Sequence, residues 1–439
     1  MLKVSGKAQI GIVFLIALLS FIGGMAARHA MGMDGVLTVA ARIVQAIPGV
    51  LQIEDASLVP AASDLRPLQT FWEVRERVRK QFVYEVEDDK KLTYGAIRGM
   101  LGSLDDPYTR FYTPEEYQEF QEETSGHFDG IGAVLESRTV GEEGASEVFI
   151  SSILPEGPAS KADLHPEDVI LAVDGIPTKG MSLQAVVNRI RGKRGTEVRL
   201  GLRRSGVDKL LEVTLTRAEI KVPVVEHRML DNQIGYVWLR SFNKQSESAL
   251  RDALTDLKAQ GMRGLVFDLS IDGGGLLDVA VSVASMFMDG GPVVYVKERG
   301  REPQPLNARP GTLVDETLPM VVLVDRGSAS ASEIVAACLQ DRKRALVVGQ
   351  NTFGKSKVQT VAELNDGSAL VLSTAVYLTP NHRDISLEYE EGKRGVKPDR
   401  FFPEPELVDG ERIKYKDWHE QQIKLAVEVL EEQIKARQG

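Results

Sequence analysis

The longest uninterrupted apolar stretch of the chain lies close to its first residue. Residues 8–27 contain no charged side chain, and two lysines precede them. About 20 apolar residues in a helix span a hydrocarbon core of roughly 30 Å, and positive charges before the span favour a cytoplasmic N-terminus. We therefore expect residues 1–30 to anchor an exported body in the membrane, with a spacer over residues 31–64. A signal peptide cleaved after Ala26 and a buried helix are the alternatives.

Beyond the spacer, the spacing of apolar positions first predicts helices and then strands. Over residues 65–125 these positions recur at helical spacing, and Thr113 before Pro114 is typical of the start of a helix. Over residues 126–217 short apolar runs alternate with Gly, Pro and Asp turns, which predicts a mostly-β domain with one helix at residues 183–190. We give the helical segment no catalytic role.

The remaining residues, 218–439, alternate between apolar runs and segments of helical period. The runs are short and continuous, which is typical of strands buried on both faces. They lie at residues 234–239, 264–269, 320–324 and 345–349. Buried strands between helices predict an α/β core, and an amphipathic pattern over residues 417–436 predicts a last helix.

The composition is that of a soluble globular body and excludes several classes of protein. Hydrophobic residues make up 43% of the chain and charged residues 26%, which excludes a low-complexity, collagen-like or generally disordered chain. The formal net charge of −10 gives no basic field to attract nucleic acid. Cys338 is the single cysteine, so it can form neither an internal disulfide nor a thiolate zinc cage. We expect it to pack in the core.

Three segments with small or polar residues follow predicted strands, where α/β enzymes place their sites. Residues 272–275 carry three glycines, which let backbone N–H groups approach a ligand closely. Residues 328–333 place serine hydroxyls at a helix N-terminus, whose positive dipole end stabilises an alkoxide or an oxyanion. In the third segment Lys355 follows Phe353 closely, and partial desolvation would lower its pKa and give a neutral amine that accepts a proton. Taken alone, the glycine segment is more often only a turn, the serine segment an ordinary helix cap, and the lysine a solvated surface residue.

Taken together, these segments resemble the carboxy-terminal processing peptidases, also called tail-specific proteases. The resemblance is carried by Ser328–Ile334, Thr352–Lys355 and Gln359, and it continues through residues 372–386 and 395–399. It implies an α/β fold: a crotonase/ClpP-like protease core with an inserted, mostly-β PDZ domain and a helical N-terminal segment. The implied activity is that of a serine endopeptidase that cleaves protein substrates near their C-termini, with no metal or organic cofactor.

The same resemblance implies a role for each residue of the site. Ser330 would be the nucleophile, Lys355 the general base and Gln359 the residue that orients the lysine, because a serine hydroxyl needs an adjacent base. The oxyanion hole would be formed by backbone N–H groups of Ala331 and of either Gly274 or Gly275.

The chain departs from the family pattern in the loop before these glycines. Ser270, Ile271 and Asp272 stand where arginine and asparagines are frequent, and Gly273 stands where proline is common. Ser356 follows the lysine where glycine is usual. The paired glycines are retained, and we expect the changes to affect substrate preference or the resting state of the site.

Residues 126–217 resemble a PDZ domain of the type that these proteases carry. The loop of Gly130, Ile131, Gly132 and Ala133 would offer backbone N–H groups to a terminal carboxylate. The substrate tail would add as a strand against the helix that bears Val186 and Ile190. Alternatively, the two glycines only make a turn.

Two other functions stay open. A Ser-His-Asp triad would use His382, the single histidine that we expect near the core; we expect most of the others at the surface. A catalytically silent PDZ scaffold or chaperone of the cell envelope is the alternative from another class. The expected partners are polypeptides with flexible C-terminal tails, with a homo-oligomer or an adaptor protein as a further possibility, on the periplasmic or other extracytoplasmic side.

Overall fold

The computed structural model describes residues 66–86, 88–140, 145–154, 157–207, 209–221, 223–403 and 415–438. The expected membrane anchor and spacer, residues 1–64, lie outside these ranges. Within them, no helix is long and apolar enough to cross a membrane. The chain divides into two units, residues 1–97 and 98–439.

The first unit is helical where it is described. It contains α3 (Arg66–Gln81) and the beginning of α4 (Asp89–Gly102), and Arg75 pairs with Asp89 at 3.1 Å. The apolar positions predicted to share one face of α3 are largely exposed, as for Val74 at 54%. The predicted helices are therefore present, but within the first unit no described residue buries the apolar face of α3.

A six-stranded sheet forms the centre of the second unit. The strand order is β10-β11-β12-β15-β16-β19, with parallel pairing from β11 onward and β10 antiparallel at the edge. The strands are β10 (Val225–Leu230), β11 (Ile234–Leu239), β12 (Gly264–Asp268), β15 (Met320–Val324), β16 (Leu346–Gly349) and β19 (Arg400–Phe401), with the 3-10 turn η4 (Asp231–Gln233) between β10 and β11. All four apolar runs predicted as strands lie in this sheet, so the α/β core is confirmed.

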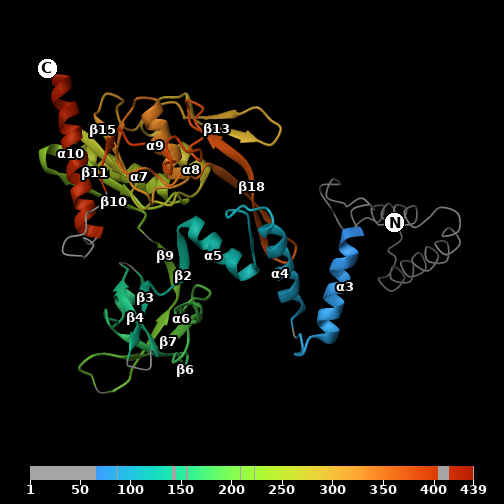
Figure 1. The fold of residues 1–439 in the computed structure, drawn as a ribbon. Helices are drawn as coiled ribbons and strands as arrows, with labels where there is room; N and C mark the ends of the chain where they lie inside the picture. Colours follow the sequence, from blue (N-terminus) through green and yellow to red (C-terminus); the bar gives the residue numbers. More distant parts are fainter. Residues whose placement is uncertain are drawn as a thin grey trace, which may run out of the picture. The chain divides into compact units, whose positions relative to one another are not determined.

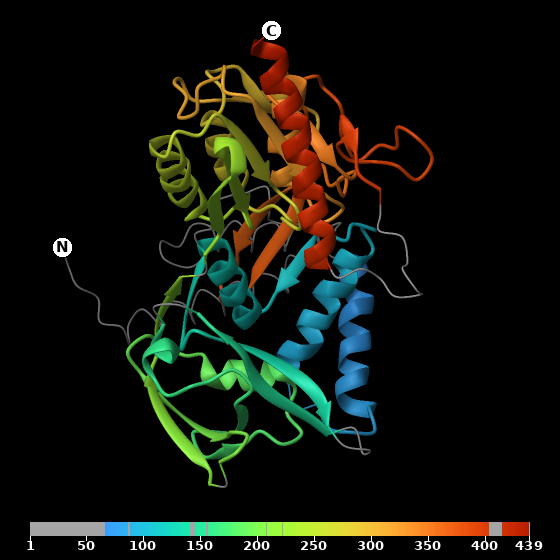
Figure 2. The same cartoon turned by 90° about the vertical axis from the view of Figure 1, so that its left-hand side faces the viewer.

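Both faces of the central sheet are buried, which explains why its strands are continuously apolar. Successive side chains of a strand point to opposite faces, so in β12 Phe267 packs on one side and Val266 on the other. Helix α10 (Tyr415–Gln438) packs on one face of the sheet. On the other face lie α7 (Ser246–Ala259), α8 (Leu277–Ser285) and α9 (Ala331–Asp341), as can be followed in Figures 1 and 2. Cys338 is fully buried in α9, and burial raises the pKa of its thiol to about 12, as expected for a packing residue.

A second sheet, which the apolar pattern did not predict, joins distant parts of the chain. Its order is β1-β18-β13-β14, and β17 also pairs with β18. The strands are β1 (Arg110–Tyr112), β13 (Pro292–Glu298), β14 (Gln304–Asn307), β17 (Lys357–Glu363) and β18 (Ala369–Leu378). After β1, helix α5 (Pro114–Ser125) begins with a capping box in which Thr113 and Glu116 bond reciprocally, so the predicted helix start is confirmed. Through β1, the segment that directly precedes residue 126 takes part in this second sheet.

The PDZ region is built of short strands around one helix. Its main sheet has the order β3-β4-β5-β7-β8, with β6 paired to β5, and a separate ladder joins β2 to β9. The elements are β2 (His127–Gly130), β3 (Ala133–Val140), β4 (Ala145–Ile153), η3 (Pro158–Lys161), β5 (Val169–Val173), β6 (Ile176–Pro177), α6 (Leu183–Ile190), β7 (Glu197–Arg203), β8 (Leu211–Thr216) and β9 (Ala218–Lys221). Val186, Ile190 and Ile131 pack in its hydrophobic core. Leu183, Ala185 and Val187 are the apolar α6 side chains that stay partly exposed, and Leu183 packs against this core.

Candidate active site

Three loops that follow strands of the central sheet meet around one cavity. They connect β12 to α8, β15 to α9 and β16 to β17; parallel strands carry their C-terminal ends to the same edge of a sheet, where such sites form. The cavity has a volume of about 470 Å³. Its lining includes all six of the residues predicted for catalysis and for the oxyanion hole: Gly274, Gly275, Ser330, Ala331, Lys355 and Gln359. Apolar side chains, among them Phe242 and Leu276, line the rest.

Ser330 has an unusual backbone conformation at the start of α9. Its φ is 55° and its ψ is −112°, whereas an ordinary serine cap is extended. A non-glycine residue at such angles costs about 1–3 kcal/mol and persists only where neighbours hold it. The Ser330 N–H donates to Oε2 of Glu333 at 2.8 Å, and its carbonyl accepts from the hydroxyl of Tyr377 at 3.2 Å. Strain of this kind is typical of catalytic residues.

Gly274 lies directly against the serine. A Cβ atom added to it would lie 2.9 Å from Cβ of Ser330 and 2.7 Å from the backbone N of Ala331, so no other residue fits without displacing the loop that carries Ser330. Its N–H donates to Oδ1 of Asp272 at 2.8 Å, and burial raises the pKa of that carboxyl well above its usual range. An oxyanion could use the Gly274 N–H only by displacing Asp272.

Glu333 joins the serine loop to the lysine loop. Its carboxylate is fully buried and accepts four hydrogen bonds. The donors are the N–H groups of Ser330, Gly354 and Lys355 at 2.8, 2.6 and 2.9 Å and the hydroxyl of Thr352 at 2.5 Å. Burial raises the pKa of Glu333, and these hydrogen bonds oppose the rise. Sequence reasoning missed this residue, although its position three residues after Ser330 is the spacing of a capping box.

Lys355 is partly buried, and its ammonium nitrogen lies 4.7 Å from the centre of the Tyr108 ring. Burial lowers the pKa of Lys355, and the charge of Arg110 lowers it further. Tyr108 and Arg110 belong to the segment around β1, so the helical region has a contact with the predicted base that the sequence did not indicate. No hydrogen bond joins Nζ of Lys355 to Oγ of Ser330 within the described ranges, which is common before substrate binds.

Gln359 stands on β17 and lines the same cavity. Its side-chain amide donates to the carbonyl of Lys357 at 3.1 Å and to Oγ of Ser373 at 3.4 Å. The structure thus brings Gln359 near the predicted dyad, but it holds the amide on its own sheet and not on Lys355.

The pH profile of activity gives a prediction for Lys355. A base must be neutral to accept a proton, so kcat/KM should rise with pH through the pKa of Lys355. Because burial and Arg110 lower that pKa, the acid limb should lie below pH 10.5, the ordinary value. Removing the nearby positive charge with Arg110→Ala should move the limb to higher pH. A limb that does not move in this variant would contradict the assignment.

Among the described residues, no histidine lines the cavity around Ser330, as the alternative triad would require. His382 stacks on Tyr295 with ring centres 4.1 Å apart and is not among the residues lining the cavity. His419 is an exception to the expectation that most histidines lie at the surface: it is only 5% exposed, because α10 packs it against the central sheet.

Models of three families match parts of this chain. Peptidase family S41 matches residues 233–400, the PDZ domain matches residues 120–203, and the N-terminal domain of the activating protease CtpB matches residues 51–116. The carboxy-terminal processing protease CtpA of Bacillus subtilis is 36% identical over 343 residues, which cover 78% of this chain and 70% of that protein. The chain belongs to peptidase family S41.

Other S41 relatives agree with this assignment. The chloroplastic C-terminal processing peptidase of Tetradesmus obliquus is 36% identical over 345 residues, covering 75% of this chain and 72% of that protein. A solved structure of a photosystem II D1 C-terminal processing protease is 35% identical, covers 76% of this chain and 87% of its own, and has a TM-score of 0.43. The processing proteases of Bacillus subtilis and Tetradesmus obliquus, each 36% identical to this chain, show that this S41 peptidase is a C-terminal processing protease of the serine class, and the PDZ model matches residues 120–203. The bacterial and chloroplastic relatives are consistent with an extracytoplasmic location.

Proposed function

We propose that this S41 peptidase cleaves proteins near their C-termini with Ser330 as nucleophile and Lys355 as general base. The observation that carries the proposal is the meeting of three separate loops around one cavity, with Ser330 strained at its rim. Desolvation of Lys355 supports the second role, because it favours the neutral amine. The site contains what acyl transfer needs: a nucleophile, a base and backbone donors.

The proposed reaction has two halves. In the first, Nζ of Lys355 accepts the hydroxyl proton as Oγ of Ser330 bonds to the scissile carbonyl carbon. The lysine then donates that proton to the leaving amine as the peptide C–N bond breaks. In the second half, the same base takes a proton from water as the water oxygen bonds to the ester carbonyl carbon. The bond from that carbon to Oγ then breaks, and Lys355 returns the proton to Oγ of Ser330. Before the first step Lys355 must turn from the Tyr108 ring toward Oγ, and we propose that Gln359 then orients it.

For the oxyanion hole we propose the N–H groups of Ala331 and Gly275. Each is a backbone group of the cavity lining, and neither donates to another group in the described part of the chain. The Gly274 N–H is engaged by Asp272, which favours Gly275 of the two glycines. Each donor of this kind contributes about 3–4 kcal/mol to transition-state stabilisation.

The PDZ domain would select substrates by their C-terminal tails. A PDZ domain adds a peptide as an extra strand beside its sheet and holds the terminal carboxylate with backbone N–H groups. We propose the loop of Gly130, Ile131, Gly132 and Ala133 for the carboxylate. Since Val186 and Ile190 are buried in the core, the partly exposed α6 residues Leu183 and Val187 are better placed to meet the tail than the two residues expected from the sequence.

We further propose that residues 8–27 anchor the protease in the membrane with its body on the extracytoplasmic side. The proposal is supported by the charge-free apolar run and the lysines before it. Self-association stays a prediction as well; the exposed apolar face of α3, with Trp72 54% exposed, is compatible with it.

Two matched peptides test the proposed function. Both carry the same flexible, apolar-ended tail, one with a free C-terminal carboxylate and the other with an amide. We expect kcat/KM to be about tenfold higher or more for the free carboxylate, because a charge-assisted hydrogen bond contributes about 1.5–3 kcal/mol. In parallel, a fluorophosphonate should label Ser330, located by mass spectrometry, and Ser330→Ala should abolish both labelling and cleavage. A label on another residue would refute the nucleophile; equal cleavage of both peptides would refute tail selection by the carboxylate.

A further inference from the structure

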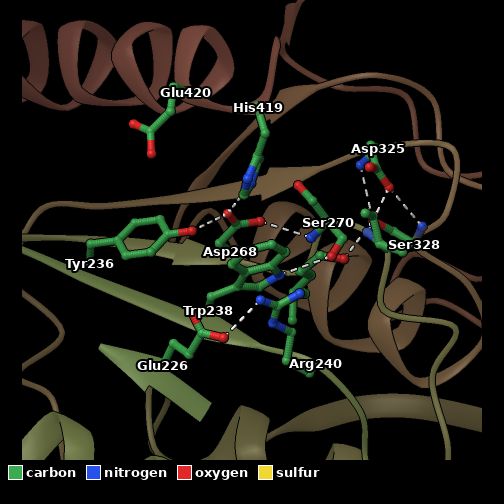
Figure 3. Close-up of polar contacts among 12 residues, drawn as sticks. Glu226, Tyr236, Trp238, Arg240, Asp268, Ser270, Asp325, Ser328, His419 and Glu420 are labelled. Atoms are coloured by element: carbon green, nitrogen blue, oxygen red, sulfur yellow. Dashed lines mark hydrogen bonds and ion pairs between the residues drawn. The ribbon is translucent and has the colours of Figure 1, made fainter. Parts of the chain in front are cut away.

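The loop that carries the two active-site glycines is held near its start by a buried carboxylate. Asp268 ends β12, and its side chain is fully buried. Its Oδ1 accepts the backbone N–H of Ser270 at 2.8 Å, and Trp238 donates from Nε1 to the Ser270 carbonyl at 3.0 Å. Figure 3 shows Asp268 pointing to His419 and Tyr236, with Ser270 beside it. The conformation at the start of the glycine loop therefore depends on where this carboxylate lies.

The position of the Asp268 carboxylate is set by two donors outside the loop. Oδ2 accepts from the Tyr236 hydroxyl at 2.7 Å and from Nε2 of His419 at 2.7 Å. A carboxylate only accepts hydrogen bonds, so Nε2 of His419 carries the proton in this contact. Tyr236 is part of β11 in the same sheet, whereas His419 comes from α10, more than 150 residues later in the chain. The C-terminal helix thus supplies one of the two side chains that hold Asp268.

The same helix also touches the serine loop. One turn before His419, the hydroxyl of Tyr415 donates to Oδ2 of Asp325 at 3.3 Å, and the two α10 rings stack with centres 5.4 Å apart. Asp325 accepts from the N–H of Ile271 at 2.9 Å and of Gly327 at 2.8 Å through Oδ1, so it joins the glycine loop to the serine loop. His419 and Tyr415 lie on one face of α10. Through Asp268 and Asp325 they contact the carboxylates that fix the glycine loop and the serine loop.

We propose that His419 is a positioning residue for the reaction: through Asp268 it fixes the loop of residues 269–276, and so the place of the oxyanion donors relative to Ser330. The proposal rests on the proposed function of Ser330 and the glycine loop. His419 touches neither the cavity nor the nucleophile. It reaches the loop through its hydrogen bond to Asp268 and through its contact with Trp238, whose ring centre lies 4.4 Å away and whose Nε1 donates to the Ser270 carbonyl. Its loss should therefore impair the transition state more than the binding of substrate.

Two substitutions separate the hydrogen bond from the packing. Glutamine at position 419 places an amide N–H where Nε2 now lies, whereas phenylalanine fills the site without a donor. We expect His419→Phe to lower kcat about 10- to 100-fold, as a misplaced catalytic group does, with KM within about twofold of the wild type. The rate of fluorophosphonate labelling at Ser330 should fall in the same proportion. His419→Gln should recover kcat to within about threefold.

Leu430→Ala is the matched control on the same helix. Leu430 is fully buried and packs near Gly264 at the opposite end of β12, with its Cδ2 3.1 Å from where a glycine Cβ would lie. The void that the shorter alanine side chain leaves in the core should lower Tm by several degrees, but kcat should stay unchanged. If Leu430→Ala lost kcat as His419→Phe does, the effect would be one of stability and the proposal would fail. A folded His419→Phe with wild-type kcat and labelling rate would overturn it equally.

A second measurement keeps the proposal testable in two unfavourable cases. If His419→Phe does not fold, His419→Asn replaces it, because its amide reaches only the position of Nδ1 and leaves Asp268 without this donor. If the wild type neither cleaves nor is labelled, the proposed function fails, and amide exchange of residues 269–276 still tests the positioning. Exchange should be faster without the donor and restored by glutamine. Unchanged exchange in a folded variant would refute the positioning itself.

Discussion

Lys355→Ala is expected to lower kcat/KM on a tailed peptide by about 10³-fold, within the range of 10²–10⁴ typical of a lost general base. The physical reason is that the Ser330 hydroxyl is a weak nucleophile at its own pKa and loses the group that accepts its proton. The backbone donors and the cavity remain, so residual activity above the uncatalysed rate should persist. Steady-state kinetics on the carboxylate peptide, with the rate of fluorophosphonate labelling at Ser330, measures the loss.

Lys355→Arg is the matched control for this change. Arginine keeps a positive charge and a long side chain over the Tyr108 ring, but it stays protonated at any usable pH. If Lys355 acts as a base, the arginine variant should be about as inactive as alanine; if its charge alone matters, arginine should retain activity. Residues that act as a unit are not additive, so Ser330→Ala combined with Lys355→Ala should be no worse than Ser330→Ala alone. A double variant much less active than either single one would contradict the dyad.

Glu333→Ala is expected to damage both the site and the fold. The change removes the acceptor of four hydrogen bonds in a fully buried position and leaves three N–H groups and a hydroxyl without it. Each buried donor left unsatisfied costs about 1–3 kcal/mol, and partial relaxation should reduce the total to about 3–5 kcal/mol of unfolding free energy. Because the carboxylate also holds Ser330 in its strained conformation, labelling of Ser330 should fall by about 10²-fold or more.

Denaturant unfolding and the labelling rate, measured together, test this prediction. Glu363→Ala is the control, since it removes an exposed carboxylate from β17 and should change unfolding free energy by less than about 0.5 kcal/mol. Glu333→Gln should fall between alanine and wild type, because one amide oxygen can still accept while the NH₂ faces other donors. Labelling at the wild-type rate in Glu333→Ala would show that the strained serine does not depend on this carboxylate.

Much of the protease core could be predicted from the sequence because its central strands are buried on both faces. Such strands need apolar side chains at every position, so β11, β12, β15 and β16 are visible as continuous runs without any knowledge of their neighbours. The strands of the second sheet were missed for the converse reason. β17 is half-buried or exposed along its length, and it is a strand because β18 pairs with it, which no local pattern reveals.

The candidate site also has parts that the sequence indicates and parts that only the tertiary structure reveals. Ser330, Lys355 and the glycines lie in short contiguous motifs, and the chemistry of each residue type suggests its role. The sequence could therefore name them as candidates. The groups that hold them come from elsewhere in the chain. Tyr108 approaches the lysine because β1 pairs with β18, and His419 reaches Asp268 because α10 packs across the sheet. No sequence motif distinguishes a single histidine in an amphipathic helix that holds a buried carboxylate from one that does not.

The sequence by itself determined the fold class and the family resemblance, and it named the groups that we propose to react, because buried strands and short motifs are local properties of the chain. Only the tertiary structure decided that Gly274 is engaged by Asp272, that Gln359 bonds within its own sheet and that His419 is buried. Those facts depend on hydrogen bonds between residues far apart in the chain. Such bonds form only when the packing of sheets and helices brings the partners within about 3 Å of each other.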